Sequence, residues 1–403
     1  MRLFKVNDNN GGVSAEQSSP LAVKRSRLNN TGVLLIVTIG LFFLLYLVSL
    51  YLFQGVNFGK YSVFFNTFFN EKPYFLMLAL GLTIVMITGS IDISVGAVTG
   101  LVAMVIAVML TDFGVNAIWT IPAALAIGLA FGVVQGFLVA YMNIQPFIVT
   151  LAGLFFARGM ISVIKAESVP ISDPTFLSWS NTKLYIPFLY NIRNNGSHDY
   201  AYIVPAGLVA LIVLVILILV LKYTKFGRAL YAVGGNTQSA LLMGIDPRKT
   251  RFLAHVLCGL LAGVGGLLFT LGMPSGSPDY GRGYEIHAIA SSVIGGTMLS
   301  GGVGLPLGTF FGVLIILLIQ RVVPLFGLTE ASWPMIITSA FLFVFIVLQS
   351  LLVIAGGKRG GGFARLIPEW LKFGKKIEEP EEAEAGAEAV AETEAEAMKE
   401  TED

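Results

Sequence analysis

Charge, cysteine and histidine are all scarce in this sequence of 403 residues. Charged residues make up 13% of the chain and hydrophobic residues 55%, whereas soluble domains carry about 25% charged residues. Cys258 is the single cysteine, so a disulfide scaffold is excluded. The three histidines, His198, His255 and His287, do not have the spacing of zinc ligands. The apolar excess is more than even two or three soluble domains could bury.

Common catalytic and nucleotide-binding motifs are missing as well. The chain contains no HExxH, GxSxG or GxxxxGK[ST] sequence. The nearest approach to a phosphate-binding loop runs from Gly55 to Lys60, is one residue too short, and is followed by Tyr61. We therefore expect this chain to bind no cofactor. If ATP drives its function, ATP and magnesium must bind to a separate partner subunit.

Long segments without charge divide the chain. Eight runs of 19 to 45 residues contain no Asp, Glu, Lys or Arg, and they lack the alternation of strands. A bilayer needs about 20 apolar residues per helix, so the two longest runs, 113–157 and 286–320, have room for two helices each. We predict an all-α polytopic membrane protein with about ten transmembrane helices, nine or eight being the alternatives. The predicted spans are 32–53, 73–90, 94–111, 117–140, 146–164, 202–222, 252–272, 286–300, 305–321 and 331–355.

Basic residues indicate the orientation. Lysine and arginine cluster before the first span, around the 223–251 loop and after the last span. The positive-inside rule places all three clusters in the cytoplasm, which requires an even number of spans and puts residues 165–201 outside. Three regions follow: a disordered cytoplasmic N-terminus at 1–30, a transmembrane domain at 31–356, and a cytoplasmic tail at 357–403 that is first basic and then Ala/Glu-rich and acidic.

The negative charge of that tail offsets a positive net charge on the rest of the protein. From Glu378 onward there are twelve acidic residues and one basic residue, Lys399, so the preceding part carries a net charge of +12 although the whole chain carries +1. The nonpolar bulk of that preceding part argues for the lipid bilayer as its partner and against nucleic acid. The tail itself has the composition of a solvated low-complexity segment.

The stretch ITGSIDISVGAVTG at 87–100 places Asp92 between two charge-free runs of 19 residues. An ionisable group at that depth is costly, and it usually faces a cavity, a partner or an interface. Ser90, Ser94 and Gly96 indicate that one helix ends here and another begins, with Ser94 or Asp92 as its cap. Broken helices at membrane depth often line transport pathways, so these four residues are candidate pathway residues. The alternative is that Asp92 only caps a helix at the membrane surface.

The basic loop at 225–251 contains a second signal. Asn236 is a suitable N-cap and Gly244 a suitable stop, which predicts a helix of about two turns that carries Leu241 and Leu242. So short a helix is marginal in water on its own. It is therefore expected to dock onto a cytosolic partner, or else to pack against the cytosolic helix ends of this same chain.

Glycine is abundant in SSVIGGTMLSGGVGLPLGT at 291–309, which allows either close helix packing or a re-entrant break. Pairs of glycines four residues apart predict tight helix packing elsewhere too. They are Gly96/Gly100, Gly128/Gly132/Gly136, Gly259/Gly263 and Gly308/Gly312.

Taken together, four long motifs resemble the permease subunits of ABC importers for monosaccharides, the ribose, xylose and galactofuranose group. They are GSIDISVG (89–96), PFIVTLAGLFFARG (146–159), FGRALYAVGGNTQSALLMGI (226–245) and VIGGTMLSGGVG (293–304). The resemblance covers about residues 30–350. The pieces ESVPI (167–171) and SGGVG (300–304), with Ser332 and Trp333, are most similar to galactofuranose permeases.

This resemblance implies a fold, partners and site residues. The fold would have ten helices in two related halves, paired with a second permease as a homodimer or a heterodimer of sister chains. A periplasmic sugar-binding protein would deliver the sugar and a cytosolic ATPase would drive transport across the bacterial inner (plasma) membrane. The segment that couples to the ATPase would comprise Gly234, Gly235, Asn236, Ala240, Leu241, Leu242, Gly244 and Ile245. Two features depart from the family: Ser90 replaces a glycine, and the Ala/Glu tail has no counterpart.

Two other classes compete with this interpretation. A polytopic membrane enzyme would need several acidic, His or Ser groups that converge on facing helices, and Asp92 alone is too little. An ion-coupled transporter without an ATPase would favour several buried carboxylates, whereas residues 73–157 contain only Asp92 and Asp112.

Overall fold

The computed structural model describes residues 20–52, 60–192, 198–330 and 332–356. Within these ranges the chain is mostly helical, and each predicted span overlaps one helix. In chain order these helices are α1 (Pro20–Leu52), α3 (Pro73–Ile87), α4 (Val95–Thr111), α5 (Thr120–Ala140), α6 (Pro146–Ile164), α8 (Pro205–Tyr223), α11 (Pro247–Gly272), α12 (Tyr284–Ile294), α13 (Pro306–Val322) and α14 (Ser332–Gly356).

Not all of these helices are long enough to cross a bilayer. Six segments of the described chain are long and apolar enough to cross a bilayer. The number rises to seven if a pair of helices bent by 46° counts as one span. The six are Leu34–Leu52, Ala117–Ala140, Pro146–Ile164, Pro205–Tyr223, Pro247–Gly272 and Pro306–Phe326. The bent pair joins Tyr61–Asn70 to Pro73–Ile87, and α4 and part of α14 are apolar but shorter. A multi-pass helical protein is therefore confirmed, whereas the count of ten spans stays a prediction.

Proline sets many of the helix starts, because it is well tolerated in the first turn, where its missing N–H costs nothing. Described helices that begin at proline include α1, α3, α6, α8, α11 and α13. In α1 this start lies at Pro20, before the apolar run. Residues 20–30 belong to this helix, although the sequence predicted disorder for 1–30, and the earlier residues lie outside the described part.

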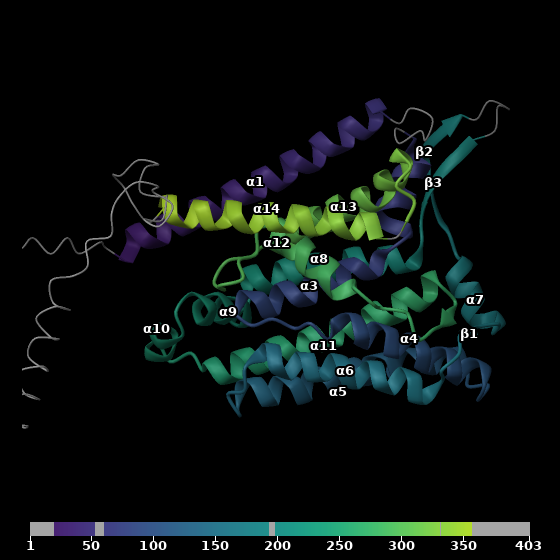
Figure 1. Ribbon diagram of the computed structural model, residues 1–403, viewed down its shortest axis with the longest axis horizontal. Coiled ribbons are helices and arrows are strands. Elements are labelled where there is room, and N and C mark those ends of the chain that lie inside the picture. The colour runs from purple at the N-terminus through teal and green to yellow at the C-terminus, as the bar shows by residue number, and fades with distance from the viewer. Residues whose placement is uncertain (1–19, 53–59, 193–197, 331, 357–403) are drawn as a thin grey trace, which may run out of the picture. The chain divides into compact units, whose positions relative to one another are not determined.

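Helix α3 is the centre of the packing, and all fifteen of its residues are buried. In Figure 1, α5, α6 and α11 lie on one side of α3, and α1 and α13 lie on the other. By contrast, α5, α6 and α8 leave large apolar side chains exposed, such as Phe137, Phe155 and Ile212. Exposed apolar faces of this extent are expected where lipid or a second membrane subunit covers the helices.

Close backbone contact joins α5 to α11. A Cβ at Gly259 would meet the Gly128 carbonyl oxygen and would lie 2.6 Å from the Gly132 nitrogen. The tight packing predicted from these glycines is confirmed, as it is for Gly308 of α13 against Gly295. Gly96 and Gly100 pack mainly against the loop at Tyr280 and Gly281, and a Cβ at Gly96 would also lie 3.1 Å from the Glu285 nitrogen in the first turn of α12.

Shorter elements lie at the two ends of the helices. At one end are α2 (Tyr61–Phe65), the π-helix η2 (Asn66–Asn70), α7 (Pro174–Asn181) and a hairpin of β2 (Leu184–Ile192) and β3 (His198–Ile203). At the other end are α9 (Lys225–Gly235) and α10 (Thr237–Leu242) (Figure 1). The remaining short elements are η3 (Ala117–Trp119), η4 (Val323–Phe326) and the antiparallel pair of β1 (Val169–Pro170) and β4 (Ser275–Gly276).

Candidate functional site: the α9–α10 loop and the α3–α4 break

The short helix predicted between Asn236 and Gly244 is present as α10. The Asn236 side-chain oxygen accepts a hydrogen bond from the Ser239 N–H at 2.9 Å, which makes it the N-cap. Gly244 has a positive φ of 77°, and the Ile245 N–H donates to the Ala240 carbonyl at 3.0 Å. The left-handed Gly244 and this hydrogen bond form a C-cap that ends α10, as is common for helices followed by glycine.

The apolar side chains of α10 divide into one that is buried and two that are not. Ala240 is fully buried, which fixes the helix to the rest of the chain. Leu241 is 62% exposed and Leu242 is 89% exposed, and Met243 next to them is also exposed. Of the two alternatives for this helix, packing against the chain's own helix ends therefore accounts for Ala240 but leaves both leucines uncovered.

Helix α9 leads from this loop back into the core. Gly234, near its end, lies against the Ile87 carbonyl of α3, and a Cβ there would also lie 2.6 Å from the Gly302 nitrogen. The Gly302 N–H donates to the same Ile87 carbonyl at 2.8 Å. Gly235 packs against Gly302, and the Tyr231 hydroxyl donates to the Gly304 carbonyl at 2.7 Å.

We call this meeting point of Ile87, Gly234, Gly235 and Gly302 the glycine junction. It brings together the three segments that stood out in the sequence, although they are more than 50 residues apart from one another. Close packing is confirmed for the glycine-rich segment, whereas a re-entrant break within the membrane stays a prediction. The segment ends α12 with turns of positive φ at Gly296, Gly301 and Gly302, and it also packs closely at Gly295 and Gly308.

The break predicted at Asp92 is also present, because α3 ends at Ile87 and α4 begins at Val95. Asp92 is 1% exposed. Its Oδ1 accepts from the Ser94 N–H at 2.9 Å and from the Ser94 hydroxyl at 2.7 Å. Ser94 occupies the N-cap position, but its own side chain makes no capping bond. Ser90 is buried beside Asp92, and Gly96 faces the loop at Gly281.

Sequence reasoning missed three polar side chains around this break. Gln135 of α5 donates to the Ser94 hydroxyl at 2.9 Å. His255 and Cys258 of α11 are fully buried and lie beside the Asp92 carboxylate. Neither ring nitrogen of His255 has a hydrogen-bond partner among the described residues. The sequence feature that could have indicated them is that Gln135 and His255 are polar residues inside long apolar runs.

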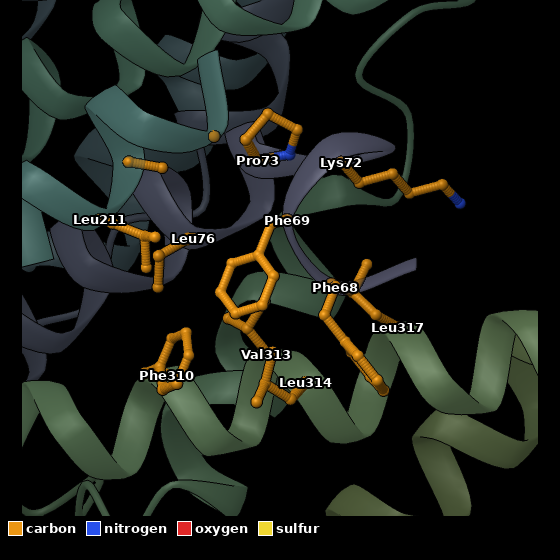
Figure 2. Close-up of a pocket in the computed structure, with 12 residues that line it drawn as sticks. Phe68, Phe69, Lys72, Pro73, Leu76, Leu211, Phe310, Val313, Leu314 and Leu317 are labelled. Carbon is orange, nitrogen blue, oxygen red and sulfur yellow. The ribbon is translucent and has the colours of Figure 1, made fainter. Parts of the chain in front are cut away.

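A narrow crevice between η2, α8 and α13 is a poor candidate for a ligand site. Its space is about 10 Å³, roughly that of one water. Phe69, Leu76 and Phe310 line it (Figure 2), whereas the Lys72 side chain points away and its amine donates to Gln320 at 2.6 Å. The crevice therefore offers a polar ligand almost nothing to bind.

A bundle of apolar helices that contains a buried break, with a capped loop helix presenting leucines at one end, is typical of the membrane subunit of a transporter. The comparisons with known proteins specify the family. Residues 64–349 match the family model described as the permease component of branched-chain amino acid transport systems. The chain belongs to this permease family and is a multi-pass protein of the inner membrane.

Among its relatives, the inner membrane ABC transporter permease protein YjfF of Escherichia coli K12 is 39% identical over 315 residues, which are 78% of this chain and 91% of that protein. The fructose import permease protein FruG of Bifidobacterium longum is 33% identical over 73% of this chain and 85% of its own length. The ribose import permease protein RbsC of E. coli K12 is 32% identical over 76% of this chain and 90% of its own length. No solved structure matches the chain.

Proposed function

We propose that this chain is the translocation subunit of an ATP-driven importer of a monosaccharide. The observation that carries the proposal is the pair of exposed leucines on a capped helix joined to the buried break, in a chain whose relatives are named as import permeases for ribose and fructose. Galactofuranose is our candidate sugar, because of the ESVPI and SGGVG segments. Membership of the permease family supports this proposal over the enzyme and ion-coupled alternatives.

The proposed complex has further subunits. A cytosolic ATPase would bind ATP and magnesium and receive α10 in a cleft, and a periplasmic binding protein would deliver the sugar. A second permease, either an identical copy or a sister chain, would complete the pathway. We retain ten spans with both termini in the cytoplasm, because the basic clusters call for an even number of spans. The acidic tail has no assigned part in this scheme.

The proposed mechanism is alternating access without covalent chemistry in this chain. Closure of the ATPase on ATP would move α10, and α9 would carry the movement to α3 and the glycine-rich segment through the glycine junction. Packed cores shift between discrete arrangements and do not deform continuously, so a small displacement at α10 can become a rocking of helices. Asp92 would lie where this movement reaches the broken helix.

Assembly is the first test. Mild detergent extraction of the tagged full-length chain from its native membrane should recover an ATPase subunit in a stable ratio, and the complex with its binding protein should import sugar into proteoliposomes only when ATP is supplied. Purified chain that accumulates sugar alone by using an ion gradient would contradict the proposal. Ligand profiling of the co-purified binding protein would identify the sugar.

Asp92→Asn is expected to lower the maximal rate of sugar uptake, so that uptake is slower at every sugar concentration. The amide oxygen can still accept from Ser94, but each bond becomes a neutral one, which contributes about 0.5–1.5 kcal/mol where a bond to a charged group contributes about 1.5–3 kcal/mol. The matched control is Asp112→Asn. Asp112 forms a half-exposed ion pair with Lys165 at 2.7 Å, and such pairs contribute about 0–1 kcal/mol. Equal uptake by both variants would rule out a pathway role for Asp92.

A further inference from the structure

A second cavity lies at the hairpin end of the helices, opposite α10. It encloses about 220 Å³ between η2, α7, β3 and the adjacent ends of α3, α8 and α11. Unlike the crevice in Figure 2, it is lined by polar and apolar groups together. We call it the outer pocket. Its volume is below the roughly 300–1,000 Å³ of pockets that enclose drug-sized ligands, so it suits a single small ring.

The lining combines aromatic rings with neutral amides. Trp179 and Tyr202 supply rings, and Asn66, Asn70 and Asn181 supply amides. No carboxylate lines this cavity in the described part of the chain, and its one charged group, Lys183, lies over the Tyr202 ring at 4.7 Å from the ring centroid. A cation is thus disfavoured, and the amides and rings that make up most of the remaining polar lining suit a neutral polar ligand.

Two of the amides are held rigidly. Asn70 donates to the Tyr202 carbonyl at 2.9 Å and accepts from the Val204 N–H at 3.0 Å. Asn66 donates to Glu71 at 2.9 Å and accepts from the Tyr202 hydroxyl at 3.3 Å. Each amide group has two N–H donors and two lone pairs, so each keeps one donor and one acceptor for a ligand. Such pre-organised groups bind without the cost of being ordered.

A monosaccharide has the chemistry that these groups match. It is neutral, its hydroxyls both donate and accept, and the C–H face of its ring packs on an aromatic side chain such as Trp179. We infer that the outer pocket binds a monosaccharide on its way into the permease. This inference rests on the proposed function, because it names the sugar's first contact with the transporter. Binding should be weak, since a sugar that enters transport must also leave the pocket.

The test is saturation-transfer difference NMR on the full-length chain in lipid nanodiscs, with D-galactose and D-ribose as probes and maltose as the oversized control. We expect saturable signals from the monosaccharides and none from maltose. Trp179→Ala should weaken the monosaccharide affinity by about tenfold or more, as loss of an aromatic anchor does in other binding sites. Trp119→Ala, which removes a 61% exposed tryptophan outside the pocket, should leave the affinity unchanged.

Trp179 also contacts Phe176, so its replacement could disturb α7. Asn181→Ala is therefore the second variant, because Asn181 is exposed and its truncation spares the packing. It should weaken binding severalfold. Absence of monosaccharide signals, equal signals from maltose, or affinities that neither variant changes would overturn the site. Uptake by the complete, unaltered transporter is measured in parallel. Uptake without binding overturns the pocket alone, and absence of both binding and uptake overturns the proposed function as well.

Discussion

Replacing Leu241 and Leu242 together by aspartate is expected to release the ATPase and abolish ATP-driven uptake, while the permease still inserts and folds. Both side chains are largely exposed in this chain, at 62% and 89%, so the folded permease loses almost no packing. Covered by a partner, each leucine would contribute about 1.5–3 kcal/mol, and two buried charges would add a further penalty. The affinity for the ATPase should fall by about 100-fold or more.

The measurement is the amount of ATPase that co-purifies with the variant, together with its elution volume and melting temperature. A matched control is Phe188→Asp with Ile192→Asp, which places the same two charges at exposed apolar positions of the hairpin at the opposite end. That control should keep its ATPase. If the α10 variant kept both its ATPase and its normal ATP-driven uptake, docking through these leucines would be wrong.

Local features of the site could be predicted from the sequence, because they depend on residues close together in the chain. The Asn236 cap and the Gly244 stop lie within one short helix, and the break around Asp92 follows from a charge between two apolar runs. The charge-free runs located the helices, but a gap between charges reports apolar length and not where a helix starts. Hence the early start of α1 at Pro20 was not predicted.

Contacts between distant segments could not be predicted in the same way. Nothing in a single sequence states that Gly234 meets Ile87, or that Gln135 and His255 surround the Asp92 break. The hairpin was missed for a different reason. Pro187 stands within β2, where it interrupts the usual strand pattern, and the register of the hairpin shifts between Tyr185 and Tyr190.

Gly234→Ala is expected to uncouple the permease from an ATPase that still binds. The added methyl group would strike the Ile87 carbonyl, which accepts the Gly302 N–H at 2.8 Å, so the glycine junction must open. Overpacking of this kind costs about 1–3 kcal/mol. Because Gly234 has no positive φ, backbone conformation is not at issue and the cost is steric. Helix α10 keeps its own cap and its exposed leucines, so ATPase binding is unaffected.

Three measurements on one preparation separate coupling from assembly: ATPase recovery, ATP hydrolysis and sugar uptake. Gly234→Ala should retain the ATPase, lower the melting temperature by a few degrees and reduce sugar moved per ATP by about tenfold or more. The control is Gly159→Ala in α6, where a Cβ would have nothing within 4 Å and where alanine favours the helix by about 0.5–1 kcal/mol. Equal transport by the two variants would show that α9 does not transmit movement through the glycine junction. Loss of ATPase from Gly234→Ala would instead indicate that the junction positions α10, because steric strain at Ile87 would then have reached the docking helix.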